Sequence, residues 1–200
     1  MTAALQSADP QLLRRRDLVV DDLIDLPEDL RYELINGRLV LTPMALPIHQ
    51  FIQHRAVDAI EERCPDAFLV NGEQAVLVDR SSELRPDAVL IRSEGATRSP
   101  VLAADVPLVV EIISRSSRRS DRDDKMKSYA TAGIPSYWLI DPLAPRVTFT
   151  QFVLGSDGNY HEQIQTDEVV TVYEPWEITL DPPAWTRKRD FLFKVARPDR

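Results

Sequence analysis

Alternating apolar and polar positions predict a hairpin near the start of the chain. Residues 31–41, R-Y-E-L-I-N-G-R-L-V-L, contain two alternating segments on either side of Asn36-Gly37. Both turn residues tolerate a positive φ, so this dipeptide between alternating segments is the strongest short-range hairpin signal. The pattern therefore predicts a strand, a tight turn and a second strand.

The next segment changes to helical periodicity. From about Ile48 to Cys64, apolar residues recur at helical spacing with charged residues between them, and Pro65 stops the pattern. We predict a first long helix over this segment.

Three strand candidates follow this helix, at 67–79, 86–91 and 108–114. Gly72 is a point where the first of them can bend. The last, L-V-V-E-I-I-S, is apolar on both faces except for Glu111, as expected of a central strand that is covered on both sides. It should be the spine of a sheet.

The second half of the chain continues the alternation of helices and strands. Ser120 and Gly133 bracket a predicted helix of about three turns. S-Y-W-L-I-D then predicts a buried strand that ends at Asp141-Pro142. Later segments predict a peripheral hairpin and an edge strand, at 147–154, 160–164 and 169–173. The pattern as a whole indicates an α/β fold with a central mixed β-sheet flanked by helices, an N-terminal hairpin and a C-terminal peripheral hairpin.

Length and patterning favour one domain. The 200 residues, 44% of them hydrophobic, suffice for one real core and hardly for two. Residues 1–16 have no periodic pattern and are expected to form a mobile arm. The domain is expected at 17–185, and 186–200 is expected to be a basic C-terminal tail.

Composition limits the setting in which the protein works. The single Cys64 cannot form an internal disulfide, and no apolar segment resembles a secretion signal or a membrane span. We expect a cytoplasmic protein without a membrane partner. The net charge of −8 argues against strong non-specific DNA binding. It does not exclude a nuclease, because carboxylates that hold a divalent metal add negative charge themselves.

Three ionisable residues stand out against this scaffold. Glu111 interrupts the most apolar strand, Asp87 begins the strand before it, and Lys125 lies on the helix after it. Burying an unpaired carboxylate costs roughly several kcal/mol, so Glu111 needs a cation, hydrogen-bond donors or a raised pKa. If the two strands pair with matching faces, both carboxylates converge and suit Mg²⁺ or Mn²⁺. Lys125 would then assist the attacking water or stabilise charge on a phosphate.

These motifs resemble a known nuclease pattern. P-D-A-V-L-I, followed by the glutamate of V-V-E-I-I-S, is similar to the signature of the PD-(D/E)XK nuclease superfamily, which has a restriction-endonuclease-like α/β fold. Y-E-L-I-N-G-R-L-V and the long block from Pro107 to Asp141 resemble the Uma-two type of restriction endonucleases. The resemblance covers roughly Asp21 to Asp181, and the long block is its specific part.

The chain departs from the superfamily signature at one position. Ile113 stands where that signature has its lysine, two residues after Glu111. In the family resembled, the following helix supplies the lysine, and Lys125 matches that position. The resemblance further implies that the backbone carbonyl of Ile112 is a metal ligand and that Glu33 and His49 extend the site.

Structural interpretations remain open for each of these residues. Asp87 after a proline is often a turn or capping residue, and Lys125 could pair with Asp121 one turn earlier. Glu111 could form an ion pair with Arg115 or Arg118, and Glu33 and His49 could simply face solvent. The aromatic residues of the long block are interpreted as core rather than as base-stacking groups, namely Tyr129, Tyr137 and Trp138.

The leading hypothesis is a Mg²⁺- or Mn²⁺-dependent endonuclease that acts on DNA. The acidic composition motivates an alternative, a nuclease-fold protein that no longer cuts and serves as a binding or regulatory subunit. A weaker alternative is a hydrolase that uses paired carboxylates without a metal. A homodimer would be convenient for cutting both strands of a duplex.

Overall fold

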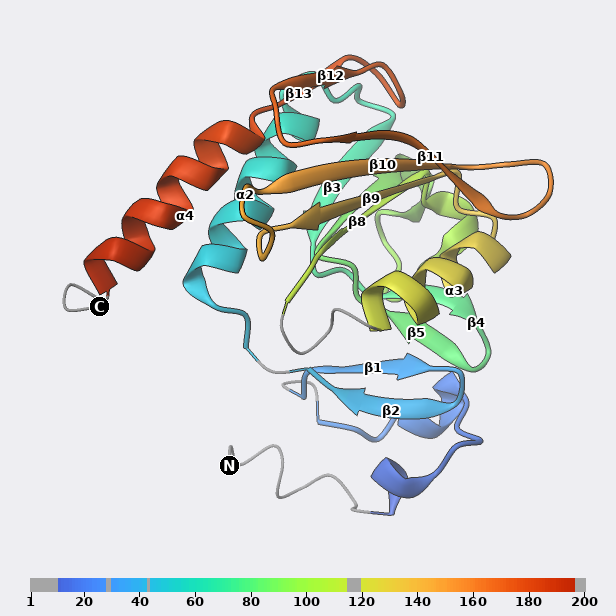
Figure 1. Cartoon of the computed structure of the whole chain (residues 1–200). Coiled ribbons are helices and arrows are strands. Elements are labelled where there is room, and N and C mark those ends of the chain that lie inside the picture. Colours follow the sequence, from blue (N-terminus) through green and yellow to red (C-terminus); the bar gives the residue numbers. More distant parts are fainter. Residues whose placement is uncertain (1–10, 28–29, 43, 115–119, 197–200) are drawn as a thin grey trace.

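The computed structural model describes residues 11–27, 30–42, 44–114 and 120–196, and Figure 1 shows their arrangement. A six-stranded sheet lies at the centre, in the order β11-β10-β9-β8-β6-β3. Its strands are β3 (Phe68–Gly72), β6 (Ala88–Arg92), β8 (Leu108–Ile112), β9 (Ser136–Asp141), β10 (Thr148–Leu154) and β11 (Tyr160–Thr166). The predicted peripheral hairpin is confirmed, because β10 and β11 pair at one edge of this sheet.

Strand β8 is the spine that its sequence predicts. All five of its residues are buried. It pairs antiparallel with β6 on one side and parallel with β9 on the other, so the sheet is mixed. Glu111 is therefore held in the interior by strands on both sides.

Helices cover both faces of the central sheet. On one face, α2 (Pro47–Glu61) packs Ile52 into a core cluster that also takes Trp185 of α4 (Pro182–Ala196). On the other face, α3 (Met126–Thr131) packs Tyr129 into a second cluster. The alternation of side chains along β6 and β8 separates these clusters, since neighbouring residues point to opposite faces.

A second sheet packs beside the face that carries α3 and has the order β2-β1-β5-β4-β7. Its strands are β1 (Tyr32–Ile35), β2 (Arg38–Leu41), β4 (Val76–Asp79), β5 (Ser82–Leu84) and β7 (Val101–Leu102). The predicted N-terminal hairpin is confirmed, and both turn residues have a positive φ, 49° at Asn36 and 75° at Gly37. A Cβ at Gly37 would lie 2.7 Å from the carbonyl oxygen of Arg16, so the turn requires glycine.

Smaller elements complete the described residues. The edge strand expected at 169–173 is β12 (Val170–Val172), which pairs with β13 (Ile178–Leu180) in a separate two-stranded sheet. Short 3-10 helices lie at Leu12–Arg14, Val20–Leu23, Ser93–Gly95 and Ala103–Asp105. No helix in the described part of the chain is both long and apolar enough to cross a bilayer.

The single strand expected at 67–79 is two strands that belong to different sheets. β3 ends at Gly72, Glu73 follows with a φ of 52°, and β4 begins at Val76. Gln53 of α2 approaches the chain at Gly72, where a Cβ would lie 2.9 Å from the Gln53 side-chain nitrogen, so a larger residue there would require Gln53 to move. The predicted strand is therefore a connection between the two sheets, with the change of direction at 73–75.

The helix predicted from Ser120 is present but begins irregularly. Residues Ser120–Lys125 form a π-helical turn, and α3 continues from Met126. Wider turns of this kind occur frequently at functional sites. Lys125 lies at the junction of the two helical segments.

Both ends of the chain differ in part from the expectation. Residues 1–10 of the predicted arm lie outside the described residues, and Leu12–Arg14 are helical. The predicted basic tail begins inside α4, which extends to Ala196, and Arg189 is buried. Its guanidinium donates to three backbone carbonyls of the loop after β9, those of Pro142, Ala144 and Pro145. The Pro182-Pro183 pair begins this helix, because proline is tolerated in a first helical turn.

Candidate functional site

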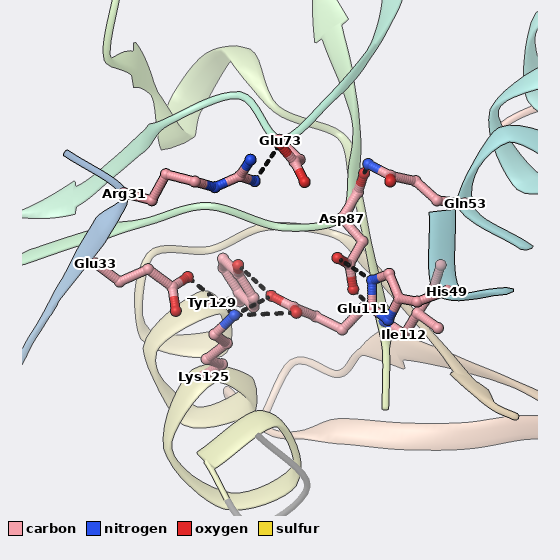
Figure 2. A network of polar contacts seen from close by, with 10 residues as sticks. All are labelled: Arg31, Glu33, His49, Gln53, Glu73, Asp87, Glu111, Ile112, Lys125 and Tyr129. Atoms are coloured by element: carbon pink, nitrogen blue, oxygen red, sulfur yellow. Dashed lines mark hydrogen bonds and ion pairs between the residues drawn. The ribbon is translucent and has the colours of Figure 1, made fainter. Parts of the chain in front are cut away.

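The two residues predicted to supply carboxylates lie opposite each other where β6 begins and β8 ends. The register pairs Ala88 with Val110, and one further step of that register sets Asp87 opposite Glu111. Val89 and Val109 belong to the same core cluster, so the matching of faces expected for these strands is confirmed. The backbone N–H of Ile112 donates to Asp87 Oδ2 at 2.6 Å, which ties the two strand ends together (Figure 2).

Glu111 lies in a buried ion cluster with Lys125 and Glu33. The Lys125 ammonium is 3.1 Å from each oxygen of Glu111 and 2.9 Å from Oε1 of Glu33. All three residues are buried. Glu33 comes from β1, and its Oε1 also accepts a hydrogen bond of 2.8 Å from the backbone N–H of Arg85. Two strands that are far apart in the sequence, β1 and β8, therefore share one ammonium group.

Tyr129 completes this cluster from α3. Its hydroxyl donates to Oε1 of Glu111 at 2.8 Å, and the residue is fully buried. Burial, followed by the nearby charges of Glu111 and Glu33, holds the pKa of the Tyr129 hydroxyl well above its usual value. The hydroxyl consequently stays protonated and remains a donor.

Asp87 is held from the opposite side, by α2. Nε2 of His49 lies 2.8 Å from Asp87 Oδ1, and the Gln53 amide donates to the Asp87 backbone carbonyl at 2.6 Å. Because an ionised carboxylate can only accept, Nε2 of His49 carries the hydrogen in this contact whenever Asp87 is ionised. The backbone N–H of Glu73 also donates to that carbonyl, and Glu73 pairs with Arg31 beside the site. Figure 2 shows these groups around Asp87.

All five side chains singled out by sequence lie in this one network. The turn or capping interpretation of Asp87 and the solvent-facing interpretations of Glu33 and His49 do not account for the side-chain contacts of these residues. Lys125 pairs with Glu33 and Glu111. The alternative partners Arg115 and Arg118, and the side chain of Asp121, lie outside the described residues.

Two residues whose side chains bond directly to Glu111 or to Asp87 were not identified from sequence as site residues. Tyr129 was interpreted only as core, and Gln53 was not singled out. Each lies four residues after a site residue on the same helix, Tyr129 after Lys125 and Gln53 after His49. Residues at this spacing share one helix face, so the signal was present in the sequence.

The oxygen atoms around Asp87 and Glu111 are of the kind that bind a hard divalent cation. The network offers carboxylate oxygens at Asp87 and Glu111 and the backbone carbonyl of Ile112, and Mg²⁺ and Mn²⁺ prefer oxygen ligands. Two carboxylates, those of Glu33 and Glu111, face the single ammonium of Lys125, and Asp87 adds a further carboxylate beside them. Within the described residues, no group of three or more His, Cys, Asp or Glu side chains is arranged to hold a metal ion. Mg²⁺ sites commonly use one or two carboxylates with water and substrate phosphate.

Comparison with known proteins supports the fold. The crystal structure of a putative nuclease belonging to DUF820 from Anabaena variabilis ATCC 29413 is similar, with a TM-score of 0.66 and 18% sequence identity. The match covers 86% of this chain and 99% of that chain. It confirms the predicted restriction-endonuclease-like fold class. No curated protein sequence gives a significant match.

A family model gives the assignment. The Uma2 model, described as "Putative restriction endonuclease", matches residues 20–181, which is nearly the range over which the sequence motifs resemble that family. The description of this family supports a nuclease function for the chain. With most of its length matched, the chain belongs to the Uma2 family of restriction-endonuclease-like proteins.

Proposed function

We propose that this protein is a metal-dependent endonuclease that hydrolyses phosphodiester bonds of DNA at the Asp87–Glu111 site. The observation that carries the proposal is the position of the Lys125 ammonium, 3.1 Å from both oxygens of Glu111 and 2.9 Å from Glu33. A lysine beside paired carboxylates matches the chemistry of phosphodiester hydrolysis, in which positive charge must meet a developing negative charge. Family membership supports the nuclease class.

The cation site follows from the donor set. Asp87, Glu111 and the backbone carbonyl of Ile112 would hold Mg²⁺ or Mn²⁺. When bound, such an ion acts as a Lewis acid on a phosphoryl oxygen and lowers the pKa of a bound water. His49 and the Ile112 N–H each bond one oxygen of Asp87 and so orient its carboxylate.

Lys125 would take the catalytic role of the signature lysine of the superfamily. Its ammonium has three donors, and the carboxylates of Glu33 and Glu111 fix its direction. A charged donor held in this way can orient the attacking water and stabilise negative charge on the phosphate. Glu33 would then be a positioning residue for Lys125.

Cleavage of supercoiled plasmid tests the proposal. We expect cleavage by the full chain with Mg²⁺ or Mn²⁺, none with EDTA, and loss of cleavage in Asp87→Ala and in Glu111→Ala. Asp105→Asn is a matched control, because the side chain of Asp105 is 18% exposed and that of Asp87 is 16% exposed, and each has a partner. Unchanged cleavage by pure Asp87→Ala protein would refute the assignment.

The products of the same assay test a further expectation. Cutting both strands of a duplex is easiest for two symmetric copies of one active site. If the protein acts as a homodimer, linear plasmid should accumulate together with nicked plasmid, and light scattering should give twice the mass of the chain. A monomer that only nicks would contradict the dimer and leave the nuclease proposal unchanged.

A further inference from the structure

Tyr129 contacts Glu111 in a way that distinguishes between its two carboxylate oxygens. The Tyr129 hydroxyl is 2.8 Å from Oε1. The Lys125 ammonium, by contrast, lies 3.1 Å from both oxygens. Lysine therefore compensates the charge of Glu111 without selecting an orientation, whereas tyrosine bonds to one oxygen only and fixes the rotation of the carboxylate.

The surroundings hold the Tyr129 ring in place. The residue is fully buried, and its ring lies 5.9 Å, centroid to centroid, from that of Tyr137 on β9. Tyr137 in turn lies 5.6 Å from the ring of Tyr160 on β11. A rigid ring delivers its hydroxyl to a fixed point, and a donor that is fixed before a ligand arrives does not have to be ordered upon binding.

We propose that Tyr129 is a positioning residue that presets the Glu111 carboxylate for the divalent cation. The inference rests on the proposed metal site and goes beyond it, because Tyr129 would touch neither cation nor substrate. Residues that orient a ligand from behind typically change metal affinity by about 10–100-fold when they are removed. The expected consequence is therefore weaker cation binding without loss of the fold.

Titration of Mn²⁺ into the full chain by calorimetry, without DNA, tests this role. Tyr129→Phe removes the hydroxyl and keeps the ring, so core packing should survive. We expect the Mn²⁺ dissociation constant to rise at least about tenfold. In plasmid cleavage, the Mn²⁺ concentration for half-maximal rate should rise by a similar factor, and the rate at saturating Mn²⁺ should change much less.

Tyr160→Phe is the matched control. Tyr160 belongs to the same aromatic cluster, but its hydroxyl donates at 2.7 Å to the backbone carbonyl of Ile134. We expect this variant to bind Mn²⁺ like the wild type, whatever its effect on melting temperature. Circular dichroism and thermal melts establish that both variants are folded.

The outcomes separate this inference from the proposed function. If the wild type and Tyr129→Phe bind Mn²⁺ equally, Tyr129 is only a core residue, and the metal site stands. If both tyrosine variants lose affinity equally, the loss reflects general packing, and the positioning role is wrong. If the folded wild type binds no Mn²⁺, the metal site itself fails, and this inference fails with it.

Discussion

The two carboxylates of the site are held in opposite ways. On the Glu111 side, the side chains of Glu111, Lys125 and Glu33 are only 2%, 6% and 6% exposed, and one ammonium pairs with both carboxylates. On the Asp87 side, the side chains of Asp87 and His49 are 16% and 13% exposed, and the partners of Asp87 are an imidazole and a backbone N–H.

Because of this difference, substitutions on the two sides of the site should affect the stability of the fold to different extents. A buried ion cluster is sensitive to the removal of any one charge, because the remaining charges are then left without compensation. Neutralising a carboxylate that lies nearer the surface costs less stability, because water can solvate the groups that were bonded to it. Chemistry and stability should therefore be coupled on the Glu111 side and largely independent on the Asp87 side.

The largest expected effect is that of Lys125→Met. The change leaves two buried carboxylates, Glu33 and Glu111, without their shared ammonium. We expect the free energy of unfolding in urea at neutral pH to fall by about 3–5 kcal/mol, and DNA cleavage to be lost. Lys127→Met, two residues along at an exposed position, is the control and should change neither. A loss of stability below about 1 kcal/mol in Lys125→Met would contradict the coupling.

A smaller effect on stability is expected from Asp87→Asn. Asparagine keeps an oxygen that can accept from the Ile112 N–H, and the site is partly open to solvent. We expect the free energy of unfolding to change by less than about 1 kcal/mol while cleavage is lost. A loss as large as that of Lys125→Met would remove the distinction between the two sides.

The smallest effect concerns Glu83, a third buried carboxylate. Its nearest charge is the half-exposed Arg85 guanidinium at 3.5 Å, and burial raises the pKa of its carboxyl group despite that partner. The folded state therefore binds a proton more tightly than the unfolded state, so stability falls as pH rises from the ordinary glutamate pKa through the raised one. We expect Glu83→Gln to be more stable than the wild type above this window and equal to it below. Urea unfolding across pH 3–8 measures the difference, and a wild-type advantage at high pH would be the opposite result.

Local patterns predicted much of the fold. The Asn36-Gly37 turn, the helix after Ile48 and the central strand around Glu111 follow from signals within about ten residues. The pattern at 67–79 indicated a bend at Gly72, but it did not predict that the two halves join different sheets, since their pairing partners are far along the chain. The start of α4 at Pro182-Pro183 was missed because prolines end helical patterns more often than they open them.

The residues of the candidate site were predicted from different kinds of evidence. Glu111 stood out because a carboxylate in an apolar strand requires compensation, and Asp87 followed from the register of the neighbouring strand. Lys125, Glu33 and His49 needed the family resemblance, since Ile113 occupies the simpler position for the lysine. Tyr129 was not predicted as a site residue because a tyrosine in an apolar block is equally typical of the core. Only the structure shows that its hydroxyl bonds to the Glu111 carboxylate.

The most direct test of a metal-dependent nuclease site is plasmid cleavage with Mn²⁺ by the wild type and by Asp87→Asn at equal concentration of folded protein. We expect nicked or linear DNA from the wild type, none from Asp87→Asn, and none from the wild type in EDTA. Equal cleavage by both proteins, or wild-type cleavage that persists in EDTA, would refute a metal-dependent site at Asp87.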